Sequence, residues 1–200
     1  MEQGKQRIAV FGAGGHGKVV VDAIERSAGL TVACVVDDHP RAEAAVLGHT
    51  VAGGREALLA RSGAIEGVIV AIGDNRTRME VADWLEAEGF VLQSVTHPAA
   101  VVALSASIGA GALIMPGAVV NAEARIGANA IINTGAVVEH DCVVGDGVPV
   151  APGAVLCGGA SVGARTLVGA GAVVLPGVKV GPALLIKAGT VVARDMESKD

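Results

Sequence analysis

The feature that most constrains the fold of this chain is a six-residue repeat in its second half. Divided into sixes from Val101, the sequence reads VVALSA SIGAGA LIMPGA VVNAEA RIGANA IINTGA VVEHDC VVGDGV PVAPGA VLCGGA SVGART LVGAGA VVLPGV KVGPAL LIKAGT VVARDM. The second residue of every unit, from Val102 to Val192, is Val, Ile or Leu, and the fifth is most often glycine. A short fixed period of this kind predicts a solenoid.

The period also predicts the cross-section of the solenoid. One aliphatic side chain per unit would point inward, while small or turn-prone residues bend the chain at each corner. Three units then complete one triangular coil, and residues one coil apart stack about 4.8 Å from each other. The composition agrees, because a thin core of Val, Ile, Leu and Ala explains why a chain that is 52% hydrophobic is only 2% aromatic.

The first half of the chain alternates strand and helix signals. We expect strands over residues 7–11, 30–38, 67–75 and 90–95, and helices over 18–27 and 76–88. Strands separated by helices predict a parallel sheet covered by helices. The sequence therefore predicts two domains: an α/β half-Rossmann-like domain over 1–96, and an all-β solenoid domain over 97–200.

A glycine-rich turn, GAGGHG at 12–17, joins the first expected strand to the first expected helix. Such a turn exposes N–H groups at a helix N-terminus, which suits a pyrophosphate. Asp37 lies 20 residues beyond Gly17, as in a dinucleotide-binding fingerprint. About four strands make only half of a dinucleotide-binding sheet, however. This argues against a nicotinamide oxidoreductase and leaves another nucleotide as the ligand.

The bulk properties exclude several classes of function. The net charge of −5 and the lack of a basic cluster argue against a nucleic-acid partner. No uninterrupted apolar run reaches 18 residues and no signal peptide opens the chain, so we expect no membrane insertion. Three cysteines without metal-ligand spacing favour a cytoplasmic protein with reduced thiols and no metal site.

The repeat resembles that of the hexapeptide-repeat acyltransferases. The ordered series FGAGGHGKVVVDAI, VVDD, AIGDNRTR, THPAA and NTGAVVEHDCVVGD is similar to their sialic-acid O-acetyltransferase-type branch. That branch includes bacterial N-acetyltransferases acting on nucleotide-linked 4-amino sugars of the bacillosamine and perosamine type. The resemblance implies a left-handed parallel β-helix, a homotrimer, acetyl-CoA bound between neighbouring prisms, and an N-terminal domain that binds the nucleotide sugar.

The same resemblance implies a set of substrate-binding residues. Gly14, Gly15 and His16 would lie against the diphosphate and the sugar. Asp37 and Asp38 would accept hydrogen bonds from the base or the ribose. Gly73 would line the pocket, and Asn133 would contact the thioester or orient the acceptor. A purely structural role, in a tight turn, is enough to explain Gly12 and Gly17.

His140 is the one histidine of the repeat and the candidate general base. It stands fourth in its unit, at a corner that projects outward, and a histidine titrates near working pH. Asp141 follows it and can hold the tautomer of the imidazole, although Glu139 on the other side competes for that role. The resemblance assigns the base to His140 and its activator to Asp141. Cys142 is expected to be a packing residue.

The acetyl-CoA site is expected along the repeat. The resemblance implies that Gly158, Ala170 and Ala188 approach the coenzyme through backbone groups. Position 149, where that branch often has a second histidine near the acetyl carbonyl, is Pro149. Either another backbone N–H stabilises the oxyanion, or the activity is reduced, or the acyl donor differs.

Together these observations predict an acetyl-CoA-dependent N-acetyltransferase acting on a UDP- or GDP-linked 4-amino-deoxy sugar. Two alternatives remain. One is O-acetylation of a sugar hydroxyl, of the sialic-acid type. The other is a non-catalytic trimeric scaffold that binds nucleotide sugars.

Overall fold

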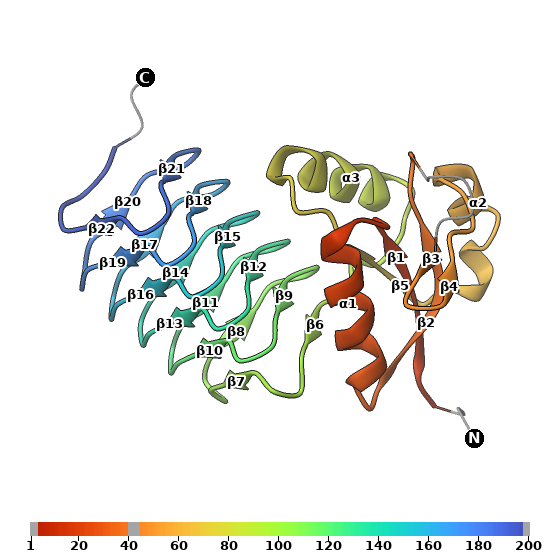
Figure 1. The fold of residues 1–200 in the computed structure, drawn as a ribbon, viewed down its shortest axis with the longest axis horizontal. Coiled ribbons are helices and arrows are strands. Elements are labelled where there is room, and N and C mark those ends of the chain that lie inside the picture. Colours follow the sequence, from red (N-terminus) through yellow and green to blue (C-terminus); the bar gives the residue numbers. More distant parts are fainter. Residues whose placement is uncertain (1–3, 40–44, 198–200) are drawn as a thin grey trace. The chain divides into compact units, whose positions relative to one another are not determined.

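The structure, a computed structural model, describes residues 4–39 and 45–197 of the 200-residue chain. The chain divides into two compact units, Met1–His97 and Pro98–Asp200. Figure 1 labels the elements of both.

The N-terminal unit is built on a three-stranded parallel sheet in the order β2-β1-β5. Its strands are β1 (Gln6–Phe11), β2 (Leu30–Val36) and β5 (Gly67–Val70). The expected fourth strand over 90–95 is reduced to one parallel bridge between Val68 and Leu92, after which β6 (Val95–Thr96) forms. Because Val68 exchanges hydrogen bonds of 2.9 Å with Val91 and Gln93, the segment borders the sheet at that point only.

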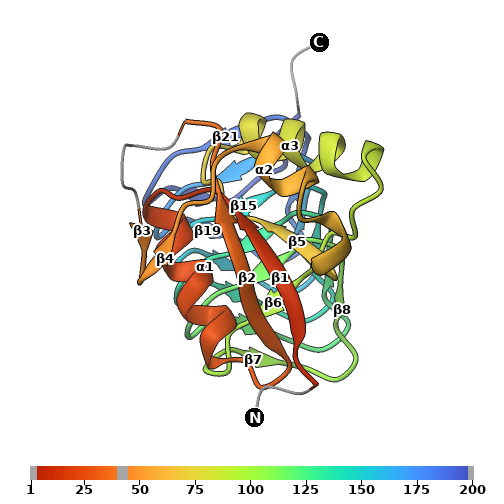
Figure 2. The same ribbon diagram turned by 90° about the vertical axis from the view of Figure 1, so that its right-hand side faces the viewer.

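Two helices lie close to the predicted positions, although the first begins at Gly15, inside the expected turn, and not at residue 18. They are α1 (Gly15–Arg26), which packs on β1 and β2, and α3 (Asn75–Ala87), which packs on β5 (Figure 2). The buried face of α1 carries Val20, Val21, Ala23 and Ile24, as its apolar period requires. The sequence did not predict three short elements: the hairpin β3 (Ala45–Val46) and β4 (His49–Thr50), helix α2 (Arg55–Leu59), and the 3₁₀ turn η1 (Ser62–Ala64).

The C-terminal unit is a parallel β-helix whose strands are two residues long (Figure 1). Residues one coil apart pair in register, as Val119 does with Val137. One sheet, the valine sheet, carries an outward valine on every strand: β7 (Val101–Val102), β10 (Val119–Val120), β13 (Val137–Val138), β16 (Val155–Leu156), β19 (Val173–Val174) and β22 (Val191–Val192).

The other two sheets complete the triangle. The second contains β8 (Ser107–Ile108), β11 (Arg125–Ile126), β14 (Val143–Val144), β17 (Ser161–Val162) and β20 (Lys179–Val180). The third contains β9 (Leu113–Ile114), β12 (Ile131–Ile132), β15 (Pro149–Val150), β18 (Leu167–Val168) and β21 (Leu185–Ile186). The regular succession of these strands confirms the predicted coils of three six-residue units.

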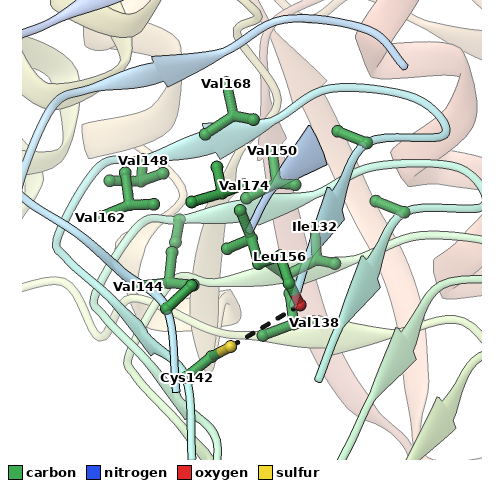
Figure 3. Packing of buried hydrophobic residues seen from close by; sticks show 14 of the residues in the cluster. Ile132, Val138, Cys142, Val144, Val148, Val150, Leu156, Val162, Val168 and Val174 are labelled. Carbon is green, nitrogen blue, oxygen red and sulfur yellow. Dashed lines mark hydrogen bonds between the residues drawn. The ribbon is translucent and has the colours of Figure 1, made fainter. Parts of the chain in front are cut away.

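The core of the β-helix is a stack of aliphatic side chains from the second and sixth positions of the units. Figure 3 shows Val138, Val144, Leu156 and their neighbours packed across the interior. Each fully buried Val, Leu or Ile contributes about 1.5–3 kcal/mol relative to exposure. The predicted inward position therefore holds along the column, and the core needs no aromatic ring.

Two corners of the β-helix matter for function. The His140 corner follows each strand of the valine sheet and comprises residues 103–106, 121–124, 139–142, 157–160 and 175–178. The Asn133 corner precedes each later strand of that sheet and comprises residues 115–118, 133–136, 151–154, 169–172 and 187–190. The valine sheet thus lies between the two corners.

Candidate active site

His140 stands at its corner with an exposed side chain, as the sequence predicts. Its Nδ1 lies 2.7 Å from Oδ2 of Asp141. Asp141 has a left-handed backbone with φ of 62°, a conformation that aspartate tolerates better than most residues. An ionised Asp141 fixes the tautomer in which Nδ1 carries the proton, which leaves Nε2 as the basic atom.

Glu139, the other candidate partner of His140, is engaged elsewhere. Its Oε2 accepts a hydrogen bond of 2.8 Å from Nδ2 of Asn121, one coil earlier. The structure thus pairs His140 with Asp141 and Glu139 with Asn121. The stacking rule predicts that residues 121 and 139 are neighbours, but the sequence analysis did not single out Asn121.

Gly158 lies against the His140 ring from the next coil. A β-carbon built on Gly158 would be 2.6 Å from Nε2 and 2.7 Å from Cε1 of the imidazole. The two coils are also joined next to this contact, because the carbonyl of His140 accepts a 2.9 Å hydrogen bond from the N–H of Gly159. The absence of a side chain at Gly158 therefore lets the ring pack there.

Cys142 is a packing residue, as predicted. It is completely buried, and its thiol donates a 3.2 Å hydrogen bond to the carbonyl of Cys157. Figure 3 shows its sulfur directed toward the core, with its longer contact to the carbonyl of Leu156 dashed. Burial raises the pKa of the thiol, so the group does not suit a nucleophile.

The remaining predicted residues of the β-helix lie away from His140 within one chain. Asn133, Ala170 and Ala188 belong to the Asn133 corner, and Pro149 begins β15 of the third sheet. Oδ1 of Asn133 accepts a 2.8 Å hydrogen bond from the N–H of Thr134. Of the predicted coenzyme-binding residues, the structure brings only Gly158 to His140.

The glycine-rich turn separates structural glycines from accessible ones. A β-carbon on Gly12 would lie 2.6 Å from the carbonyl oxygen of Ala71, and one on Gly17 would overlap the carbonyl of Gly12. A β-carbon on Gly14 or Gly15 would meet nothing within 4 Å. The N-terminus of α1 has no side-chain cap and no acidic residue in its first turn. Its N–H groups therefore remain available to an anion.

His16, the second residue of α1, is neutral in the folded chain. Burial, and then the charge of Arg78, lower its pKa from 6.5 to about 4. Its Nε2 is buried and lacks a hydrogen-bond partner among the described residues. His16 thus offers no positive charge to a diphosphate at neutral pH.

Arg78 is the buried cation beside this turn. Its guanidinium donates to the carbonyls of Ile72 and Gly73, each at 3.2 Å, and to Oδ1 of Asn75 at 2.7 Å. Burial lowers its pKa to about 10, so it stays charged at neutral pH. The predicted pocket residue Gly73 thus takes part in binding Arg78 through its carbonyl.

Asp37 and Asp38 follow β2 and line a cavity of about 340 Å³. Asp37 supports the glycine-rich turn, because Oδ2 accepts a 2.7 Å hydrogen bond from the N–H of Ala13. Asp38 holds Arg55 through a 2.9 Å contact from Nε to Oδ2. The apolar part of the lining is Phe11, Ile72 and Val81. Sequence reasoning missed Arg55, which lies in a helix too short to show a period.

The described ranges, 4–39 and 45–197, contain no group of three side chains suited to hold a metal ion. No helix in those ranges is long and apolar enough to cross a bilayer.

Two family models match the chain. The PglD N-terminal domain matches residues 7–85, which contain the glycine-rich turn and the cavity. The bacterial transferase hexapeptide model, of six repeats, matches residues 105–140 and 123–158, which contain His140.

Solved structures resemble the whole chain. The perosamine N-acetyltransferase PerB of Caulobacter crescentus, in complex with CoA and GDP-perosamine, is 43% identical with a TM-score of 0.90, covering 96% of this chain and 91% of that one. The acetyltransferase domain of PglB from Neisseria gonorrhoeae FA1090, in complex with acetyl coenzyme A, is 35% identical with a TM-score of 0.90, covering 98% and 94%.

A curated relative matches over a shorter stretch. The UDP-N-acetylbacillosamine N-acetyltransferase of Bacillus subtilis (strain 168) is 36% identical over 119 residues, 55% of this chain. The matched stretch spans about half, 51%, of that relative's length. With the two family models and the two whole-chain structural matches, the chain belongs to the hexapeptide-repeat acetyltransferases that carry a PglD-type N-terminal domain.

Proposed function

We propose that this protein is an acetyl-CoA-dependent N-acetyltransferase acting on a nucleotide-linked 4-amino sugar. The observation that carries the proposal is the exposed His140–Asp141 pair, with Gly158 against the ring. Two of the relatives named above have amino-sugar substrates or ligands, one linked to UDP and one to GDP. This leaves the base open and favours an amine over a hydroxyl acceptor.

The reaction is a direct acyl transfer. The sugar amine attacks the carbonyl carbon of the thioester, and Nε2 of His140 takes the proton from the nitrogen as the C–N bond forms. The intermediate collapses with cleavage of the C–S bond. The imidazolium then returns its proton to the departing sulfur, giving the amide and free CoA. Asp141 stabilises the imidazolium during this cycle.

The developing oxyanion needs a donor, and Pro149 has no N–H to offer. The N–H of Gly158 suits this task. It lies one coil from His140, and no residue of the described ranges accepts its hydrogen bond.

The acetyl-CoA site is completed by a second copy of the chain in a homotrimer. His140 and Gly158 occupy one corner, whereas Asn133, Ala170 and Ala188 occupy the other. A neighbour that packs against the valine sheet would bring its Asn133 corner to the His140 corner. The outward valines support this contact. Val101 and Val191, on the two end strands of the sheet, are more than 60% exposed in the single chain, and the four outward valines between them are partly exposed.

Two measurements test the function. CoA release with nucleotide-linked 4-amino sugars should exceed that with free sialic acid, and His140→Ala should lower turnover by roughly 10²–10⁴-fold. Light scattering should give three times the mass of the chain for both proteins. Wild-type turnover in His140→Ala would overturn the mechanism, and a monomer would overturn the shared site.

A further inference from the structure

We propose that the cavity behind the glycine-rich turn selects guanine, so that the acceptor is a GDP-linked amino sugar. This inference rests on the proposed function, which leaves the base open. It concerns two cavity residues, Glu80 of α3 and Arg55 of α2, to which the sequence analysis assigned no role.

The cavity is rich in carboxylates, of which one is available to a ligand. Asp37 is occupied by the N–H groups of Ala13 and His39, at 2.7 and 2.8 Å, and Asp38 by Arg55. Among the described residues, Glu80 is held only by a 2.8 Å ion pair with Arg76, whose side chain is 88% exposed. Such a surface pair is worth little, so Glu80 can turn to a base without a large cost.

Arg55 provides a fixed donor on the same cavity. Its Nε is held by Asp38 at 2.9 Å, and its guanidinium carbon lies 4.5 Å from the centre of the Trp84 ring. Trp84 in turn packs edge-to-face with Phe11, at 6.2 Å between centroids. The guanidinium is therefore anchored on one side by an aromatic ring that does not line the cavity. Its two Nη atoms make no hydrogen bond with any described residue.

Guanine matches this combination better than uracil does. Its N1–H and N2–H₂ groups are adjacent donors, which one carboxylate accepts together, and its O6 and N7 are adjacent acceptors for an arginine fork. Uracil presents a single N–H between two carbonyl oxygens. A carboxylate that accepts this N–H meets those oxygens as well and is repelled. Adenine has one amino donor beside an acceptor nitrogen, so it can donate to the carboxylate only one of the two hydrogen bonds that guanine donates.

The test is calorimetric titration of the wild-type chain with GDP, UDP and ADP, in the absence of acetyl-CoA. We expect GDP to bind at least tenfold more tightly than UDP or ADP, since one good bidentate base contact discriminates by about that factor. Equal affinities, or a preference for UDP, would overturn the guanine assignment and leave the acetyltransferase proposal intact. Lack of binding by all three would overturn both.

Three substitutions identify the contact. Glu80→Gln should lower the affinity for GDP about tenfold and leave the affinity for UDP unchanged. Arg76→Met, which removes the ion pair but no cavity residue, should leave GDP binding within about twofold of wild type. Glu86→Gln is the matched control, an exposed carboxylate of α3 outside the cavity. If Arg76→Met lowers the affinity for GDP as much as Glu80→Gln does, Glu80 does not contact the base and the proposal fails.

Discussion

Gly158 lies so close to His140 that a β-carbon on it would be 2.6 Å from Nε2 of the imidazole. The backbone there suits alanine, because Ala122 and Ala164 occupy the same position of their units. We therefore expect Gly158→Ala to displace the ring and lower kcat at least tenfold while the β-helix stays folded. Steady-state kinetics and circular dichroism measure the two effects.

A double variant separates this contact from other roles of Gly158. In a His140→Ala background the added methyl group has no ring to meet. Gly158→Ala should then leave the melting temperature unchanged, whereas it should lower it when His140 is present. The same shift in both backgrounds would show that the methyl group clashes with something else.

Asp141→Asn tests the partner of the base. Asparagine also tolerates the left-handed backbone at φ of 62°, so the substitution removes the charge and keeps the shape. We expect kcat to fall roughly 10–10²-fold because the imidazolium loses its counter-charge; the exposure of the pair keeps the loss below that of removing the base. Glu139→Gln is the control and should keep kcat near wild type, since Glu139 bonds to Asn121.

The glycines of the N-terminal turn should respond differently to alanine. Gly12→Ala places a β-carbon 2.6 Å from the carbonyl oxygen of Ala71 at φ of 122°, and should destabilise the chain by about 2 kcal/mol or more. Gly15→Ala meets open space and should change stability by less than about 0.5 kcal/mol. It should nevertheless weaken nucleoside diphosphate binding, because its methyl group lies beside the free N–H groups. Urea denaturation and calorimetry distinguish the two outcomes, and unimpaired binding by Gly15→Ala would remove that turn from the site.

His16 should make the stability of the fold depend on pH. Its pKa is about 4 in the folded chain and 6.5 when unperturbed. Between these values the unfolded chain binds a proton that the folded chain does not. The contribution of His16 to the free energy of unfolding is therefore fully present above pH 6.5 and is lost as the pH drops toward 4. The loss should be about 2 kcal/mol, allowing for partial solvent contact.

Urea denaturation at pH 7 and pH 4.5 measures the contribution of His16. The difference in unfolding free energy between the two pH values should shrink in His16→Asn, because asparagine does not titrate. Equal differences in the two proteins would mean that His16 is not buried as a neutral group.

The β-helix is predictable from the sequence because the register between its coils follows from a fixed six-residue period. The inward position recurs every six residues, so each corner and each stacked pair follows by counting, including His140 with Gly158. The pairing of Asn121 with Glu139 obeys the same rule. By contrast, the choice of Asp141 over Glu139 depends on side-chain rotamers, which no spacing specifies.

The N-terminal unit shows what local pattern leaves out. Helices α1 and α3 are long enough for a period to appear, whereas α2 spans only Arg55–Leu59. The place of Arg55 between Asp38 and Trp84 arises from packing between segments far apart in the chain. The residues that line the cavity therefore emerged from the fold, and only its two aspartates were found by motif.

The in-register pairing of Val119 with Val137, one full coil later, constrains how a gene for such a chain can change in length. Loss or gain of a single six-residue unit would rotate every later unit by a third of a turn about the axis of the β-helix. A change of this kind before His140 would move its side chain to a different corner. Only whole coils can be removed or duplicated without altering the azimuth of the groups that follow. The number of residues between two positions of the repeat thus determines which way their side chains point as well as how far apart they lie. Insertions and deletions of other lengths should be confined to segments outside the β-helix.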